Sequence, residues 1–107
     1  MNHRWPEEVK EKLRELVADT PLAYRQYLTG CVEIVTEQQA QKLGRSEVDE
    51  DAMIRAYIVC VPRHLRDGLH DVLGEHNIDL QYYQPVFDEP VPAAAHAANA
   101  NSRNSTA

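Results

Sequence analysis

Two amphipathic segments joined by one short turn constrain the fold of this chain more than any other feature. Pro21 predicts the start of the first segment, because proline already has a helical φ and a first turn does not need its missing N–H. Gly44 predicts its end, because glycine readily adopts the left-handed conformation that closes many helices. Between them, apolar side chains recur at steps of three and four residues, which is typical of a helix that packs on one face. These are Tyr24, Tyr27, Leu28, Cys31, Val35, Ala40 and Leu43, and Ile34 fits the spacing less cleanly.

The second segment begins at Asp49, a predicted N-cap whose carboxylate can accept a free backbone N–H. Glu50 and Asp51 follow in the first turn, where the positive end of the helix dipole favours acidic side chains. The predicted inward face then consists of Met53, Tyr57, Cys60 and Val61, with the small Ala52 and Ala56 beside it. Together the two segments predict a helix–loop–helix core.

A shorter helix is predicted before this core. Trp5-Pro6 opens it, and its apolar face has the same spacing in Val9, Leu13, Leu16 and Val17. The charged residues between them are predicted to lie on the surface. Trp5 is interpreted as an anchor that covers the end of the bundle, so Trp5, Pro21, Gly44 and Asp49 are the predicted structural residues.

After the core, Leu65, Leu69, Val72 and Leu73 predict a further helix over 62–76. The alternating stretch 78–82 has the period of a strand but has no second strand to pair with, so it is expected to form an extended arm. Pro85, Pro90 and Pro92 are taken to exclude further helix. From residue 88 onward, alanine, asparagine and serine prevail without an apolar face, which predicts a disordered tail.

The predicted fold is therefore all-α. It is a small bundle of three to four helices with a helix–loop–helix core, a short extended arm and a disordered C-terminal tail. The expected division is a flexible N-terminus at 1–4, one helical domain at 5–87 and the tail at 88–107.

Composition limits the partners and the compartment. The net charge of −6 argues against nucleic-acid binding, which needs Lys and Arg to neutralise phosphates. No apolar run approaches the roughly 20 residues of a membrane span, and the N-terminus lacks the apolar core of a signal peptide. These observations predict a cytoplasmic protein without a membrane partner. Cys31 and Cys60 both lie on inward faces and are interpreted as small buried apolar residues.

No catalytic motif is evident: the chain has no nucleophile elbow, no phosphate-binding glycine loop and no H-E-x-x-H. The interpretation leans against an enzyme, and neither a metal nor a cofactor is predicted. His64, His70 and His76 are six residues apart, which distributes them around an ideal helix rather than on one face. His70 flanks the apolar face and is the single, weak candidate for contact with a cofactor.

Three arginines, Arg55, Arg63 and Arg66, fall close together in the sequence. Most such clusters are solvated surface or simple ion pairs. The alternative is that they form a binding surface for an acidic patch on a partner protein.

The order of several residues resembles the PCP-reductase domain, the small C-terminal domain of the B subunit of light-independent protochlorophyllide reductase, which also exists as a stand-alone unit. The resemblance covers 5–58, and the helix and arm at 62–87 lie outside it. The residues that carry it are Trp5, Leu13, Leu16, Pro21, Tyr24, Arg25, Glu33, Ala40, Gly44, Val48, Asp49 and Ala56.

This resemblance implies a non-catalytic accessory or protein-interaction module. Its partner would be a larger protein, such as a nitrogenase-like reductase subunit, and its setting chlorophyll or bacteriochlorophyll biosynthesis in photosynthesis. Two alternatives remain open. The helix–loop–helix is also similar to a histone-like dimerisation unit, which would make the chain a homodimer, and one histidine could bind a tetrapyrrole.

Overall fold

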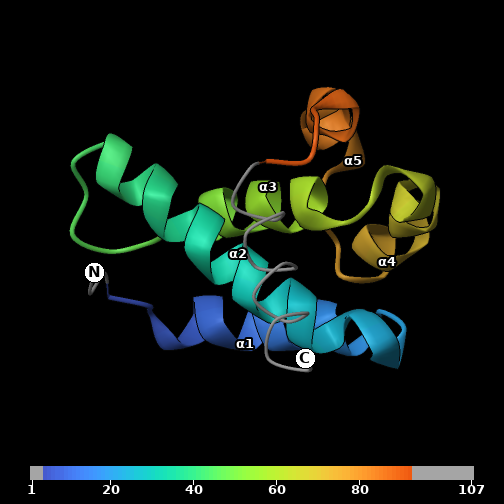
Figure 1. Cartoon of the computed structure of the whole chain (residues 1–107), viewed down its shortest axis with the longest axis horizontal. Helices are drawn as coiled ribbons and strands as arrows, with labels where there is room; N and C mark the ends of the chain where they lie inside the picture. The colour runs from blue at the N-terminus through green and yellow to red at the C-terminus, as the bar shows by residue number, and fades with distance from the viewer. Residues whose placement is uncertain (1–3, 93–107) are drawn as a thin grey trace, which may run out of the picture.

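The computed structural model describes residues 4–92, and in this part of the chain every regular element is a helix (Figure 1). The predicted all-α class is confirmed. Of the tail predicted to be disordered at 88–107, residues 93–107 lie outside the described residues, whereas Asp88 belongs to the last helical element. The elements are α1 (Glu7–Ala18), α2 (Leu22–Lys42), α3 (Glu50–Cys60), the 3₁₀ helix η1 (Arg63–Gly68), α4 (Leu69–Glu75), α5 (Leu80–Tyr83) and the 3₁₀ helix η2 (Gln84–Asp88).

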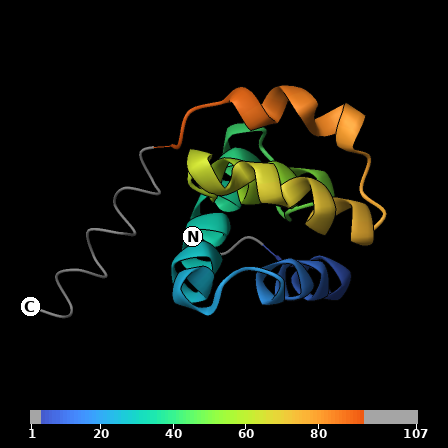
Figure 2. The same cartoon turned by 90° about the vertical axis from the view of Figure 1, so that its right-hand side faces the viewer.

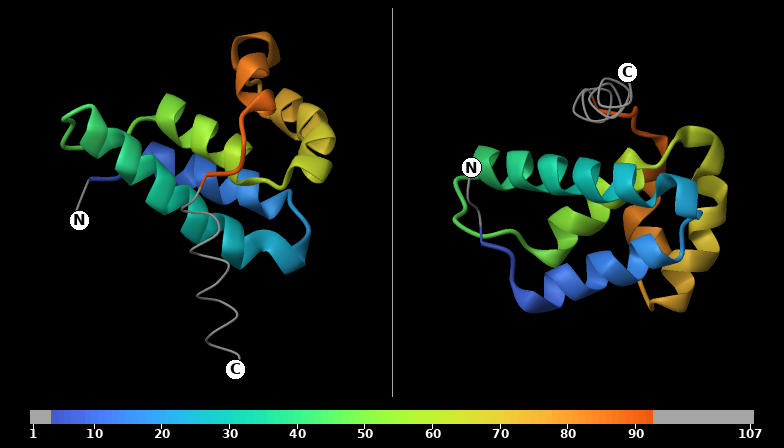
Figure 3. Two further views of the ribbon diagram at one scale, coloured as in Figure 1. Left: turned by 45° about the horizontal axis from the view of Figure 1, so that its top comes forward. Right: turned by 60° about the horizontal axis from the view of Figure 1, so that its bottom comes forward.

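Helix α3 is the centre of the fold. It packs along α2, and it also contacts α1 on one side and η2 on the other, so that it lies between the first helix and the last (Figures 2 and 3). Because it is covered from several directions, most of its side chains are buried rather than a single stripe. Its buried residues are Met53, Ile54, Ala56, Tyr57, Ile58, Val59 and Cys60.

The predicted ends of the core helices are largely confirmed. The Asp49 carboxylate accepts a hydrogen bond from the backbone N–H of Ala52 at 2.8 Å, as an N-cap does. Gly44 has a φ of 69°, the left-handed conformation that follows α2. Pro21 occupies the N-cap position of α2. Thr20, just before it, donates its hydroxyl to the carbonyl of Val17 at 2.6 Å.

Arg4 is held in place by backbone pairing with the loop between α2 and α3. Its N–H donates to the carbonyl of Ser46 at 3.1 Å, and its own carbonyl accepts from the N–H of Val48 at 2.9 Å. This isolated bridge ties the entry to α1 to the turn before α3. It fixes the backbone immediately before Trp5.

The segment after α3 differs from the sequence prediction in two ways. The helix expected over 62–76 is divided into η1 and α4 at Gly68, a residue that lowers helix propensity by about 1 kcal/mol relative to alanine. The expected extended arm is instead helical, because Asp79 caps α5 by accepting from the N–H of Gln81 at 3.0 Å. Pro85 lies at the start of η2, where a missing N–H is tolerated.

Cys31 of α2 and Cys60 of α3 form a disulfide, with their Cα atoms 6.2 Å apart. Both side chains are completely buried, as predicted, but they are not the free apolar cysteines that the sequence suggested. Their pairing depends on how α2 and α3 pack, which the spacing of either helix alone does not reveal. The bond joins α2 to α3, the two helices that pack along each other in the core.

Thr36 of α2 is completely buried, and its hydroxyl has no hydrogen-bond partner among residues 4–92. A buried hydroxyl without a partner loses its hydration and gains nothing in return. Replacement with valine, which keeps the shape, is therefore expected to raise the free energy of unfolding by about 1 kcal/mol. Urea denaturation measures this change.

Thr29→Val is the matched control, because the Thr29 hydroxyl donates to the carbonyl of Arg25 at 2.9 Å. It should gain no stability. A Thr36→Val variant that is less stable than the parent would contradict this account of the core.

Candidate functional site

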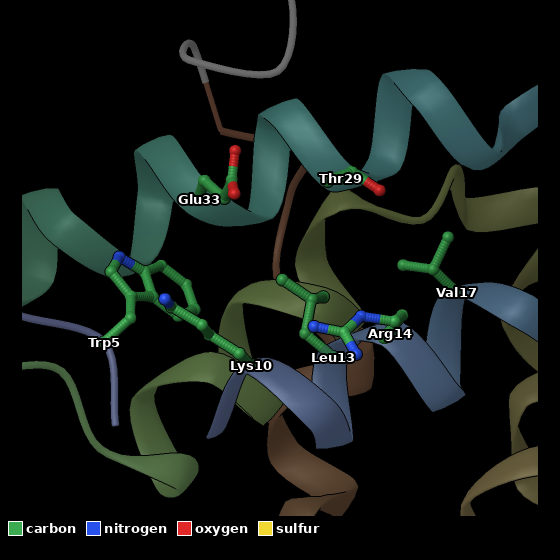
Figure 4. Close-up of a pocket in the computed structure, with 7 residues that line it drawn as sticks. All are labelled: Trp5, Lys10, Leu13, Arg14, Val17, Thr29 and Glu33. Atoms are coloured by element: carbon green, nitrogen blue, oxygen red, sulfur yellow. The ribbon is translucent and has the colours of Figure 1, made fainter. Parts of the chain in front are cut away.

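A cleft of about 270 Å³ lies between α1 and α2 and is the candidate binding site (Figure 4). In Figure 4, Thr29 and Glu33 lie on α2 and the other helix is α1, with Trp5 at one end of the cleft and Val17 at the other. The residues that line the cleft are Trp5, Lys10, Leu13, Arg14, Val17, Thr29 and Glu33.

The sequence of α1 places two kinds of side chain beside this cleft. Leu13 and Val17 belong to the buried face of α1 and supply an apolar floor. Lys10 and Arg14 are four residues apart, so they lie on one face of the helix, one turn from each other. Both are exposed, and both border the floor.

The charges around the cleft are not neutralised by one another. Among the ion pairs of residues 4–92, Lys10, Arg14 and Glu33 do not appear. Burial, and secondly the charge of Glu37, raise the pKa of the Glu33 carboxyl above its ordinary value. The cleft therefore offers two cations on one wall and a partly desolvated carboxylate on the other.

A second hollow, of about 220 Å³, is formed where the start of α2 meets the end of α3 and η1. Its lining is apolar apart from the hydroxyl groups of Tyr24 and Thr20, and that of Thr20 is already bound to a backbone carbonyl. It has no charged group with which to orient a ligand. The α1–α2 cleft is the better candidate because it combines an apolar floor with charged rims.

Arg55, one of the predicted partner-binding residues, lies within a cluster on the surface of α3. Its guanidinium donates to the carboxylate of Asp51 at 3.0 Å and to the hydroxyl of Tyr82 at 3.2 Å. Tyr83 completes the cluster by donating its hydroxyl to Asp51 at 2.8 Å. These contacts attach α5 to α3, and the hydrogen bond to Tyr82 is the main reason that the pKa of Arg55 is raised.

Arg66 is only 3% exposed, unlike a typical surface arginine. Its guanidinium donates to four backbone carbonyls, at distances between 2.5 and 3.0 Å. Burial, and next the charge of Arg63, lower its pKa. Arg63 itself is exposed. The three predicted arginines therefore do not form one exposed surface. The accepting carbonyls are those of Val59, Val61, Phe87 and Glu89.

His70, the candidate for cofactor contact, stacks on the ring of Phe87 with 4.8 Å between ring centroids. It is half-buried and covers the end of η2. His76 lies elsewhere, with its Nε2 atom 2.7 Å from the carboxylate of Asp19. Within the part of the chain that the structure describes, no group of His, Cys, Asp and Glu could hold a metal ion.

The cleft is the feature that sequence reasoning missed. Lys10 and Arg14 were assigned to the solvated surface because they lie outside the apolar stripe of α1. A signal was present in their spacing, since both residues flank Leu13 at the edge of that stripe. What the spacing does not show is that α2 places Glu33 opposite them.

The chain matches, over residues 1–87, a family described as a protein of unknown function (DUF2621). It belongs to this family. One relative is a protein of Bacillus subtilis (strain 168) named membrane protein YneK, which is 30% identical over 85 residues. That match covers 79% of this chain and 60% of the relative. No solved structure matches the chain.

These matches overturn the resemblance to the PCP-reductase domain, and with it the predicted accessory role in chlorophyll biosynthesis and photosynthesis. The residues that suggested it are mostly helix signals, such as Pro21, Gly44 and Asp49, which unrelated helical domains share. The proposed reductase partner and the two alternative functions are not supported either.

The expected cytoplasmic location and the expected absence of a membrane partner are also contradicted, because the relative is named as a membrane protein. Within residues 4–92, none of the helices has both the length and the apolar character required to cross a bilayer.

Proposed function

We propose that this chain is the ligand-binding domain of a membrane-associated protein, and that it holds a small amphiphilic molecule in the α1–α2 cleft. The observation that carries the proposal is the combination of an apolar floor with charged side chains that lack partners among the described residues. Binding sites for small molecules are usually concave and apolar, with a few polar groups that fix the orientation of the ligand.

The membrane association is supported by the name of the relative, of which this chain spans 60%. The Cys31–Cys60 disulfide supports a position on the oxidising side of the membrane. Disulfides persist in extracytoplasmic compartments and are rare in the cytosol, where thiols are kept reduced.

Trp5 provides a direct test, because it is the single tryptophan of the chain and lines the cleft. A ligand in the cleft changes the surroundings of the indole, so a saturable change in tryptophan emission is expected. The titration uses four small solutes that share an apolar carbon chain and differ in their polar group: an anion, a cation, a zwitterion and a neutral alcohol. If none of them changes the emission, the proposal is wrong.

Thr29→Phe places a ring in the cleft and should abolish the response without adding a second tryptophan. Gln38→Phe is the matched control, since Gln38 is exposed on the same helix and does not line the cleft. It should respond as the parent does. An unchanged response in Thr29→Phe would show that the ligand binds elsewhere.

A further inference from the structure

We infer that the ligand of the α1–α2 cleft is an apolar zwitterion with the size and charge of leucine, its carboxylate bound between Lys10 and Arg14 and its ammonium bound by Glu33. This inference rests on the proposed function, because it requires the cleft to be a binding site. It adds the chemical class of the ligand and the orientation in which it binds.

The volume of the cleft matches that of a small molecule. The cleft of about 270 Å³ corresponds to roughly nine water molecules at their share of the liquid volume. It lies just below the usual range for sites that enclose drug-sized molecules, which begins at about 300 Å³. A single amino acid fits this size class.

One wall of the cleft is suited to a carboxylate. Lys10 and Arg14 extend from successive turns of α1, and both are free of carboxylate partners in the described part of the chain. A guanidinium can donate two parallel hydrogen bonds to a carboxylate, and an ammonium adds a further charged donor. Leu13 lies between them in sequence and provides apolar contact beneath the bound group.

The opposite wall requires a positive group. Glu33 lines the cleft from α2, the helix opposite Lys10 and Arg14 (Figure 4). A simple anion would bring its charge close to this carboxylate and would be opposed by it. A zwitterion neutralises both walls at once, since its ammonium can bind Glu33 while its carboxylate binds the two cations.

The apolar part of the ligand has contacts ready at both ends of the cleft. Val17 lies at one end and the Trp5 indole at the other. Trp5 is only half-buried, although the paired backbone of Arg4 holds the chain beside it. A branched aliphatic side chain of the size of that of leucine would cover part of the indole that is otherwise open to solvent.

The test compares leucine with two analogues that each lack one charge. Isocaproate has the same carbon skeleton without the ammonium, and isoamylamine has it without the carboxylate. Leucine is expected to bind at least about tenfold more tightly than either, because each analogue loses one charged interaction. The dissociation constants are measured on the whole chain by tryptophan emission and by calorimetry.

Variants assign each charge to its wall. Glu33→Gln should weaken the binding of leucine about tenfold while leaving that of isocaproate equal or stronger. The double variant Lys10→Glu with Arg14→Glu should weaken the binding of leucine at least as much as Glu33→Gln does. It should weaken the binding of isocaproate still more, because isocaproate has only its carboxylate as a charged group. Glu75→Gln and Lys42→Glu change exposed charges away from the cleft and should alter neither constant. Circular dichroism during thermal unfolding checks that each variant is folded.

The outcomes separate this inference from the proposed function. If isocaproate or isoamylamine binds as tightly as leucine, the inference that the ligand is a zwitterion is wrong, while the cleft remains a binding site. If leucine binds best but Glu33→Gln does not weaken its binding relative to that of isocaproate, the proposed orientation is overturned. If no probe alters the emission of Trp5, both the inference and the proposed function fall.

Discussion

Reduction of the Cys31–Cys60 disulfide should lower the free energy of unfolding by about 3.5 kcal/mol. The two cysteines are separated by 29 residues in the sequence, and a bond across that span restricts the unfolded chain severely. A domain of this size has a total stability on the order of 5–10 kcal/mol, so the loss is a large fraction of it. Urea denaturation of the oxidised and the reduced chain measures the difference.

The comparison uses one sequence in two redox states, which keeps the volume of the core almost unchanged. Cys31→Ala with Cys60→Ala serves as the control, because its stability should not respond to a reducing agent. Both sulfur atoms are buried, so reduction of the folded chain is expected to be slow unless urea is present. Equal midpoints for the oxidised and reduced parent would show that the bond contributes nothing to stability.

Local sequence signals were sufficient to predict where the helices of the core begin and end. Asp49 and Gly44 act through hydrogen bonds and backbone angles within a few residues, and such features can be recognised without knowledge of the tertiary fold. The period of the apolar residues then predicts which face is buried. The all-α class follows from these two kinds of information.

The same reasoning failed after α3 for an identifiable reason. The alternation over 78–82 has the period of a strand, yet the Asp79 carboxylate caps a short helix and Pro85 stands where a 3₁₀ helix can begin. A single turn of helix is stable there because Tyr83 packs against α3 and bonds to Asp51. That contact spans 32 residues, and no local pattern reveals it.

The features that define the candidate site are also products of long-range packing. The Cys31–Cys60 pair, the position of Glu33 opposite α1 and the burial of Arg66 all depend on how separate helices meet. An arginine among other charged residues is normally exposed, so the sequence assigned Arg66 to the surface. Its burial becomes intelligible only when the carbonyls that surround it are known.

Replacement of Arg66 with methionine should lower the free energy of unfolding by about 3 kcal/mol. The guanidinium joins the end of α3 to the end of η2, because it binds the carbonyls of Val59 and Val61 together with those of Phe87 and Glu89. Methionine fills part of the space but provides no donor. Four carbonyls would then lose their partner, and buried acceptors without a partner are costly.

Arg63→Met is the matched control: Arg63 is exposed and three residues away, so its replacement should change stability by less than about 0.5 kcal/mol. Because Arg66→Met also detaches η2, the Phe87 ring should lose its stacking on His70, which the chemical shifts of the His70 ring report. If Arg66→Met and Arg63→Met were equally stable, the four hydrogen bonds of Arg66 would contribute nothing measurable to stability. The C-terminal helices would then be held by the packing of Val86 and Phe87 in the core and by the Arg55, Tyr82 and Tyr83 contacts.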